Sequence, residues 1–341
     1  MSRSDSVPTL EDVARAAGVS TATVSRCLNK PDKVVATTRE RVLAAVEQLG
    51  YTPHFGARIM AARQTFTIGA IIPTMENAIF AQGLQAFQEA VHARGYTLLV
   101  SSSAYQPERE AEQIRTLLSR GADGLLLIGY DRDPETYKML AQKRTPVLAT
   151  WAYDATQAIP AVGFDNHAAM FALAQHVLSL GHAHIGVISG MTRGNDRAAE
   201  RLTAIRLAAA GAGLGAEALP VIETPYSIEN GAEAFAELMR RTLRPSVVLC
   251  GNDVLAAGAV RQAAAMGLRV PEDVSITGFD DIELARVVTP ALTTVHVPHR
   301  AMGAKAAEVL INMVEGGTNA PSIALETTLK LRASLGPPKL P

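Results

Sequence analysis

The sequence predicts an α/β protein with a small helical head and a larger body built on parallel sheets. From Phe66 onward, apolar runs alternate with amphipathic stretches, as in "TIGAIIP" followed by "FAQGLQAFQEAVHARG". Such alternation is typical of parallel strands covered by helices. The pattern starts again near residue 165, which predicts two similar halves of about 100–150 residues each. Before Phe66, the apolar spacing predicts short helices.

The first two helices of the head have clear start and stop signals. Thr9 and Asp12 predict a capping box for the first helix, and Gly18 is its expected end. Ser20 can cap the second helix, which points Val24 inward. The short connection at Gly18 therefore predicts two helices that pack closely against each other.

The third helix of the head is expected to run to Leu49. Thr37 and Glu40 predict a capping box at its start, and Gly50 is its expected C-terminal stop. Apolar side chains recur at helical spacing along it. The predicted buried stripe consists of Val42, Leu43, Val46 and Leu49.

The charge is distributed unevenly along the 341 residues. The formal net charge is −1, but residues 1–65 have an excess of three positive charges and the remainder has an excess of four negative charges. A modestly basic head on a mildly acidic body is compatible with nucleic-acid binding through the head.

Composition also bears on the compartment. No stretch approaches eighteen uninterrupted apolar residues, and "MSRSDSVPTLEDV" lacks the apolar core of a signal peptide. Cys27 and Cys250 lie far apart, which indicates a reducing environment without a disulfide framework. We therefore expect a cytoplasmic protein without membrane contact.

The second helix of the head is the most specific local feature. Two helices joined at Gly18, the second rich in Ser, Thr and Arg, fit a helix-turn-helix, whose second helix enters the major groove of DNA. Thr21, Ala22 and Arg26 share one face. Arg26 can donate two hydrogen bonds to a guanine, and Thr21 and Ala22 can contact a thymine methyl group. The alternative is an ordinary capped surface helix.

Other hydroxyl side chains of the head suit contacts with phosphates, which position the helix without reading sequence. The predicted phosphate contacts are Thr23, Ser25 and Thr38. Thr9 and Ser20, at the starts of the first two helices, complete the predicted DNA-binding set of the head.

The head and body together resemble a known family. The stretch "TLEDVARAAGVSTATVSRCLNKPDKVVATTRERVLAAVEQLGYTP" is similar to the headpiece of the lactose/galactose repressor (LacI/GalR) family, and the match continues through "LGHAHIGVISG", "GNDVLAAGAV", "RVPEDVSITGFDD" and "PALTTVHVP". The resemblance implies a cytosolic homodimeric repressor that binds a pseudo-palindromic operator. It also implies a body similar to the periplasmic sugar-binding proteins, with two subdomains around an effector.

This resemblance suggests the domain boundaries. We expect a helix-turn-helix head at residues 1–52, a hinge segment at 53–65, and an effector-binding and dimerisation domain at 66–335. The N-subdomain is expected at about residues 66–164 and 296–335, and the C-subdomain at about 165–295. No heptad repeat follows "LRASLGPPKLP", so a tetramerising coiled coil is not expected.

The hinge segment has a departure from the family pattern. In the family, a segment like residues 54–62 folds on DNA and inserts a Leu into the minor groove, and Met60 occupies that position here. An apolar wedge can unstack a base step, and Met can serve as one. Arg58 is expected to contact a phosphate or the partner chain. The alternative for Met60 is packing against its own body.

The resemblance also implies an effector site at the carboxyl ends of the parallel strands, where ligands of such sheets bind. Arg201, with Arg197 or Asn195, would anchor the effector, and Asp280 and Asn252 would bond its hydroxyl groups. Aromatic and apolar side chains would wall it; these are Ile79, Phe80, Trp151 and Tyr226.

Purely structural roles remain as alternatives for several of these residues. Arg197 and Arg201 could form surface ion pairs with Asp196 or Glu200, Asn252 could be a helix cap, and Phe80 could be a core residue. The paired arginines favour a sugar or a sugar acid, with a gluconate-like anion preferred. Whether the effector is an inducer or a corepressor stays open, as do the operator and the effector's identity.

The sequence gives no sign of catalysis. No nucleophile elbow or phosphate-cradling loop is visible, and the stretch "GAGLG" follows a predicted helix instead of opening one. His182 and His184 lack partners at metal-ligand spacing, so we interpret both as structural. We expect no catalytic residues, no metal and no cofactor. The competing classes are a solute-binding protein of a sugar transporter and a sugar-converting α/β enzyme.

Overall fold

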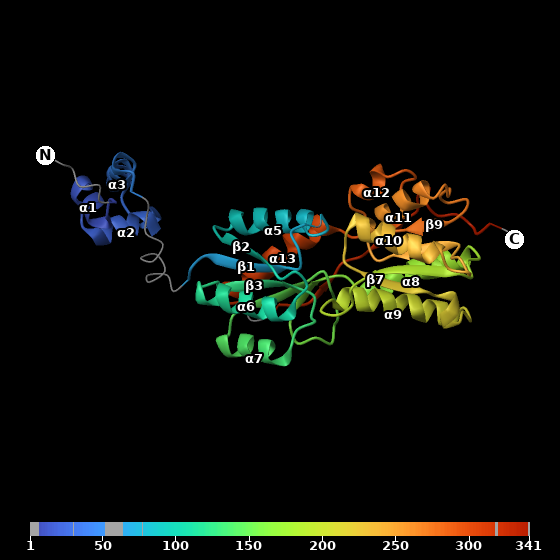
Figure 1. Cartoon of the computed structure of the whole chain (residues 1–341). Coiled ribbons are helices and arrows are strands. Elements are labelled where there is room, and N and C mark those ends of the chain that lie inside the picture. The colour runs from blue at the N-terminus through green and yellow to red at the C-terminus, as the bar shows by residue number, and fades with distance from the viewer. Residues whose placement is uncertain (1–6, 30, 52–63, 77, 318–319, 340–341) are drawn as a thin grey trace. The chain divides into compact units, whose positions relative to one another are not determined.

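The computed structural model describes residues 7–29, 31–51, 64–76, 78–317 and 320–339. The chain forms two compact units, Met1–Thr65 and Phe66–Pro341. Among the described residues, no helix is both long enough and apolar enough to cross a membrane. Figure 1 shows the elements of both units along the chain.

The described residues of the head form α1 (Leu10–Ala17), α2 (Thr21–Asn29), the 3-10 turn η1 (Pro31–Lys33) and α3 (Ala36–Leu49). The predicted capping box of α1 is present, because Thr9 and Asp12 each accept a hydrogen bond from the other's backbone N–H. Gly18 follows with φ of +64°, a left-handed conformation that costs glycine little. The first two predicted helices are thus confirmed.

Two details predicted for α3 are wrong. The helix begins at Ala36 with Val35 at its N-cap, and no side chain caps it, so Thr37 lies inside the first turn. Leu43 is 49% exposed, whereas Val42 is fully buried. The helix turns Val42 and Ala45 toward α1 and α2, and Leu43 lies outside this buried sector.

The body has two sheets of parallel strands. The first sheet has the order β11-β5-β4-β3-β1-β2 and the second the order β7-β6-β8-β9, and a short antiparallel pair joins β10 and β12. The strands of the first sheet are β1 (Thr67–Ile72), β2 (Thr97–Ser102), β3 (Gly124–Ile128), β4 (Val147–Thr150), β5 (Ala161–Gly163) and β11 (Ile323–Ala324). The others are β6 (Ile185–Gly190), β7 (Val221–Thr224), β8 (Val247–Cys250), β9 (Ser275–Thr277), β10 (Thr294–His296) and β12 (Thr328–Lys330).

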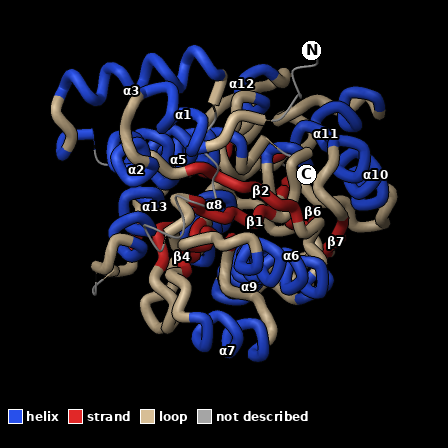
Figure 2. Tube along the Cα trace, turned by 90° about the vertical axis from the view of Figure 1, so that its left-hand side faces the viewer, coloured by secondary structure: helices blue, strands red, loops and turns tan. Residues whose placement is uncertain are grey.

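Helices cover both faces of each sheet, and Figure 2 shows the strands of the body enclosed by them. The first sheet carries α5 (Ala81–Ala93) and α13 (His299–Val314), which pack together, as well as α6 (Pro107–Ser119) and α7 (Pro134–Lys143). The second sheet carries the pairs α8 (Asn166–Ser179) with α9 (Asp196–Gly211), and α10 (Ile228–Met239) with α11 (Asp253–Ala265). The short α12 (Leu284–Val287) packs on α11. We call the first sheet with its helices the N-lobe and the second the C-lobe.

The burial of the strands explains why they appear as apolar runs in the sequence. The strands β1, β3, β4, β6 and β8 are buried along their whole length, as expected for strands with helices on both faces. Because β11 lies in the first sheet while Ser334 bonds the backbone of the second, the C-terminal segment connects both lobes. The parallel α/β architecture predicted from the sequence is confirmed.

Candidate functional site

The exposed face of α2 carries the side chains predicted to read DNA. Thr21, Ala22 and Arg26 are exposed, whereas Val24 and Cys27 are buried in the core of the head. Cys27 also donates weakly to the Arg39 carbonyl, which agrees with a packing role. The helix therefore presents one polar face to solvent and uses the opposite face to hold itself in place.

The start of α2 is fixed by hydroxyl groups. Ser20 Oγ accepts a hydrogen bond from Thr23 N–H at 3.2 Å and lies 2.9 Å from Thr23 Oγ1. Ser25 and Thr38 are half-buried, and Thr9 is exposed. The predicted hinge residues Arg58 and Met60 lie outside the described residues, and so their roles stay predictions.

The predicted effector residues converge where the strands of both lobes end. Trp151 follows β4 of the N-lobe, while Tyr226, Asn252 and Asp280 follow β7, β8 and β9 of the C-lobe. All but Tyr226 are at most 2% exposed. Parallel strands bring their carboxyl ends to one edge, and here the edges of the two sheets face one cleft.

Asp280 is the most unusual residue of the cleft. Its carboxylate is buried, and both oxygen atoms lack a hydrogen-bond partner. Its φ is +101°, which is unfavourable for any residue except glycine. Burial raises its pKa, although the nearby Arg201, His299 and Arg197 act in the opposite direction. An unpaired, buried carboxylate on a strained backbone marks a place where a ligand can bond.

Arg201 is held firmly beside Asp280. Its Nε donates to Asn166 Oδ1 at 2.9 Å and its Nη1 donates to the Gly251 carbonyl at 2.6 Å. The guanidinium also lies 4.1 Å from the centre of the Phe279 ring. Arg201 is thus a buried, oriented donor and not a surface charge.

Arg197 differs from this pattern. It is buried, but its Nη1 forms an ion pair with Asp196 Oδ1 at 2.7 Å. The pair with Asp196 is present, but it is not the surface pair of the alternative interpretation, because Arg197 is buried and Asp196 is half-buried. Asp196 also accepts a hydrogen bond from the Tyr130 N–H of the N-lobe, so the pair connects the two lobes.

Asn195 and Asn252 both cap helices. Asn195 Oδ1 accepts from Ala198 N–H at the start of α9, and its Nδ2 donates to the Met191 carbonyl and to Tyr226 Oη. Asn252 Oδ1 accepts from Leu255 N–H, but its buried Nδ2 has no partner. The cap predicted as an alternative for Asn252 is present, and its amide still offers one donor.

Aromatic rings line the cleft on both sides. Phe80 meets Trp151 edge-to-face at 5.2 Å between ring centres, and both belong, with Ile79, to the main core cluster. Tyr226 lies over Gly190, where any Cβ would fall 2.2 Å from the ring. The structure therefore gives Phe80 a core role as well as a place beside the cleft.

Three cleft residues escaped the sequence reasoning. Tyr105 follows β2, and its ring centre is 5.8 Å from that of Tyr226; burial raises its pKa. Asn166 links Arg201 to the Trp151 carbonyl. His299 begins α13 and lies 6.2 Å from Trp151 between ring centres. Tyr105 and Asn166 each come three residues after a strand, β2 and β5, and that position was a usable signal for both.

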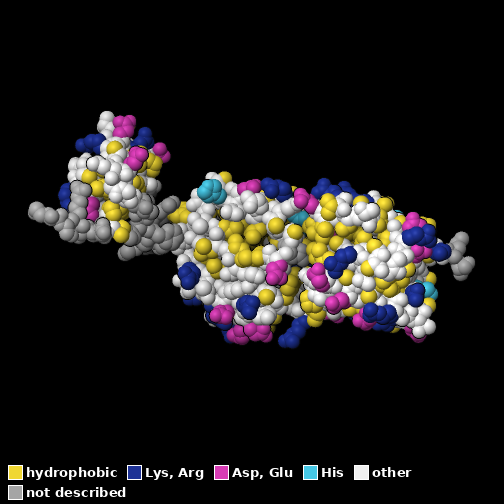
Figure 3. Space-filling view, turned by 45° about the horizontal axis from the view of Figure 1, so that its top comes forward, with side chains coloured by type: hydrophobic (Ala, Val, Ile, Leu, Met, Phe, Trp, Pro, Cys, Tyr) yellow, Lys and Arg dark blue, Asp and Glu magenta, His cyan; other side chains and the backbone are white. Residues whose placement is uncertain are grey.

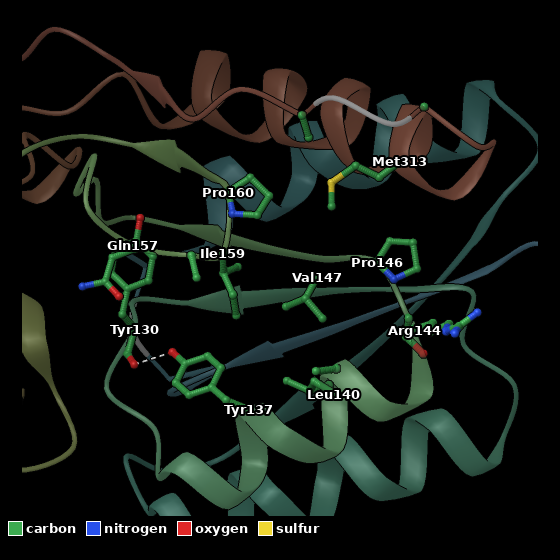
Figure 4. Close-up of a pocket in the computed structure, with 15 residues that line it drawn as sticks. Tyr130, Tyr137, Leu140, Arg144, Pro146, Val147, Gln157, Ile159, Pro160 and Met313 are labelled. Atoms are coloured by element: carbon green, nitrogen blue, oxygen red, sulfur yellow. Dashed lines mark hydrogen bonds between the residues drawn. The ribbon is translucent and has the colours of Figure 1, made fainter.

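Two hollows can be compared with the cleft as ligand sites: one adjoins it, and the other lies in the N-lobe. One of about 460 Å³ adjoins Asn166 and Arg197. Another, of about 780 Å³, is lined by Tyr137, Leu140 and Met313 of the N-lobe, as Figure 4 shows. Among the described residues that line the second hollow, only Arg144 has a charged side chain, and it is exposed. Because ligand sites need convergent polar groups, the strand-end cleft is the better candidate despite the larger volume elsewhere.

His182 has a structural position. Its ring bonds Ser246 Oγ and the Gly336 carbonyl, and so it ties the C-terminal segment to the C-lobe. In the part of the chain that the structure describes, no group of three or more His, Cys, Asp or Glu side chains could hold a metal ion.

Comparison with known proteins settles the family. Residues 9–54 match the profile of bacterial regulatory proteins of the lacI family, and residues 174–335 match a periplasmic binding protein-like domain. Catabolite control protein A of Priestia megaterium is 32% identical over 302 residues, which cover 89% of this chain and 91% of that protein. The chain belongs to the lacI family.

Solved structures of lacI-family proteins have the same architecture. A lacI-family transcriptional regulator from Silicibacter pomeroyi superposes with a TM-score of 0.88 at 26% identity, covering 96% of this chain and 99% of the other. The lac repressor dimer bound to operator and the anti-inducer ONPF gives a TM-score of 0.85 at 26% identity, covering 96% and 99%. The predictions of a regulator, a helix-turn-helix head and a periplasmic-binding-protein-like body are confirmed, and the family is one of regulators and not of enzymes.

Proposed function

We propose that this lacI-family regulator represses transcription as a homodimer on a pseudo-palindromic operator, and that a small sugar or sugar acid bound between the lobes controls its operator affinity. The observation that carries the proposal is the buried Asp280 carboxylate, which lacks partners at a cleft walled by both lobes. A purely structural cleft would have paired this group.

The head supports the DNA-binding part. Thr21, Ala22 and Arg26 are exposed on one helix whose opposite face is buried, as a helix entering the major groove requires. We assign base contacts to these three and phosphate contacts to Thr9, Ser20, Thr23, Ser25 and Thr38.

A face of the body supports dimerisation. A groove of about 570 Å³ lies between residues 76, 78, 81 and 82 of the N-lobe and residues 226–229, 254 and 282–284 of the C-lobe. Met75 and Val287, which are close in sequence to lining residues, are strongly exposed. Figure 3 shows hydrophobic side chains gathered on both lobes of the body. A second copy placed on such a face would bury apolar surface from both lobes at once.

Contacts between the lobes across the cleft can couple effector binding to DNA binding. Asp196 of the C-lobe accepts a hydrogen bond from the Tyr130 N–H of the N-lobe, and the ring of Tyr226 lies against that of Tyr105. An effector that changes these contacts changes the angle between the lobes, and with it the spacing of two hinge segments in a dimer. The effector then shifts the population of the DNA-binding arrangement.

Operator footprinting tests the proposal. The full-length protein should protect a pseudo-palindromic site near the genes it regulates, and an effector should change the protein concentration needed for protection. Absence of site-specific protection at low salt would remove the repressor assignment.

The hinge has its own test. A Met60→Gly variant should lose affinity for the operator more than for random DNA, because the wedge acts only at the specific site. An equal loss on both DNAs would remove the wedge role.

A further inference from the structure

Several buried polar groups around the cleft have no partner. They are both carboxylate oxygens of Asp280, Nδ1 of His299, Nε1 of Trp151 and Nδ2 of Asn252. Each residue is at most 4% exposed. Unpaired groups of this kind destabilise a fold, so their concentration at one place points to a ligand that completes them.

His299 has a fixed proton arrangement. Its Nε2 lies 3.2 Å from the Asp280 backbone carbonyl, and a carbonyl oxygen can only accept a hydrogen bond. Nε2 therefore carries the proton, and Nδ1 of the neutral ring presents a lone pair. Burial lowers the pKa of His299, although Asp280 opposes this effect, which favours the neutral ring.

The same contact fixes the place of the ring. The Asp280 carbonyl holds one edge of the imidazole, and the indole of Trp151 lies beside it at 6.2 Å between ring centres. His299 thus adds a third acceptor to the two oxygens of Asp280, and the unpartnered donors are Trp151 Nε1 and Asn252 Nδ2.

The charges around the cleft do not favour an anion. Asp196 already neutralises Arg197, and Asp280 lies near Arg201 as an opposite charge. The adjoining hollow of about 460 Å³ is lined by four carboxylates against the single arginine Arg197. These carboxylates belong to Asp154, Asp165, Asp196 and Glu200.

We infer that His299 is a specificity-determining residue of this cleft, accepting a hydrogen bond from the effector through Nδ1, and that the cleft takes a neutral polyhydroxylated ligand and not a sugar acid. A ligand with several hydroxyl donors can satisfy Asp280 and His299 together, whereas a carboxylate in this position would face acceptors. The inference rests on the proposed effector function of the same cleft, and it narrows the class of ligand.

Matched pairs of probes test the ligand class. Neutral aldoses and the aldonates of the same carbon skeleton, such as glucose with gluconate and galactose with galactonate, are titrated against the full-length protein. Binding is followed by the fluorescence of Trp151, the only tryptophan of the chain, and by the thermal midpoint. We expect at least one neutral aldose to bind at least tenfold more tightly than its aldonate. Tighter binding of aldonates, or no response to any neutral sugar, would overturn the inference.

Two variants separate ligand contact from structural support. His299→Gln can keep a donor for the Asp280 carbonyl but removes the Nδ1 acceptor, whereas His299→Asn can place an amide near Nδ1 but loses the carbonyl contact. If Nδ1 binds the ligand, His299→Gln should weaken binding of the best aldose about tenfold or more at an unchanged thermal midpoint, and His299→Asn should weaken binding less. Wild-type affinity in His299→Gln would overturn the assignment.

Footprinting separates this inference from the proposed function. If the wild-type protein protects an operator and responds only to aldonates, the repressor assignment stands and the neutral-ligand inference fails. If it binds neutral aldoses but protects no operator, the ligand inference stands and the repressor assignment fails.

Discussion

Helix α2, to which we assign the base contacts, and the cleft at the strand ends present their polar groups in opposite ways. On α2, Thr21 and Arg26 are exposed to water, and Ser20 and Thr23 satisfy each other. In the cleft, Asp280 and His299 are buried and only partly bonded. The polar groups of the head therefore do not destabilise it in the absence of DNA. The unpaired groups of the cleft destabilise the ligand-free body, and a bound ligand that pairs with them would remove this cost.

A second contrast lies inside the C-lobe. Asp253 is as deeply buried as Asp280, but its oxygens accept from Ile282 N–H at 2.9 Å and from Thr294 Oγ1 at 2.6 Å. Burial raises the pKa of both carboxyls. Asp253 thus holds a loop and a strand in place, whereas the Asp280 carboxylate has no hydrogen-bond partner.

The largest expected effect comes from removing the satisfied carboxylate. Asp253→Ala leaves the Ile282 amide and the Thr294 hydroxyl buried without acceptors, and we expect a loss of about 2–5 kcal/mol in the free energy of unfolding. Urea unfolding followed by Trp151 fluorescence reports on the body alone, because Trp151 is the only tryptophan. A loss below that of the exposed control Glu217→Ala would contradict the role given to Asp253.

The next effect concerns the head. Arg26→Ala should weaken operator binding by about 10–100-fold, or about 1–3 kcal/mol, with a smaller loss on random DNA. Effector binding, measured through Trp151, should not change. Arg41→Ala, also exposed but on α3, is the matched control. Equal losses in the two variants would mean that Arg26 contributes charge and not base recognition.

Replacing the unpaired carboxylate of Asp280 should change the free energy of unfolding in the opposite direction to Asp253→Ala. Asp280→Asn removes a charge that burial disfavours, so the ligand-free protein should gain roughly 1 kcal/mol at pH 7 while effector binding is lost. A less stable variant that retains effector binding would contradict the assignment of Asp280 to the effector.

The pH dependence of unfolding is a second way to compare the wild-type protein with Asp280→Asn. A raised pKa means that the folded state binds the Asp280 proton more tightly than the unfolded state, so wild-type stability falls as pH rises from about the ordinary value of 3.8 through the folded-state pKa. Asp280 also raises the pKa of Asp253, so removing its charge reduces the loss of stability from Asp253 as well, and both contributions have the same sign. The advantage of Asp280→Asn should therefore grow with pH across this window in urea titrations.

The smallest effect tests a corrected detail of the head. Leu43→Ala should change the stability of the head by less than about 0.5 kcal/mol, because Leu43 is largely exposed. Val42→Ala should cost about 1–2 kcal/mol, because Val42 is fully buried. Hydrogen exchange of peptides from residues 10–49 in the full-length protein measures both. Equal effects would restore the buried stripe predicted for Leu43.

Local patterns determined most of the head and the order of elements in the body. Capping by Thr9, the turn at Gly18 and the apolar spacing of each helix depend on residues within a few positions of one another, so the sequence displays them directly. The alternation of strands and helices likewise predicted parallel sheets, and the strand ends predicted where Asp280, Asn252 and Trp151 would meet.

The tertiary structure alone decided the chemistry of the cleft. Arg197 is paired with Asp196, Arg201 depends on Asn166, and His299 takes its proton arrangement from the Asp280 carbonyl. These partners come from different helices and strand ends, and no local spacing encodes them. Whether a buried polar group is satisfied depends on residues far away in the chain. For this reason the sequence predicted which residues follow the strand ends but could not give the charge balance among them.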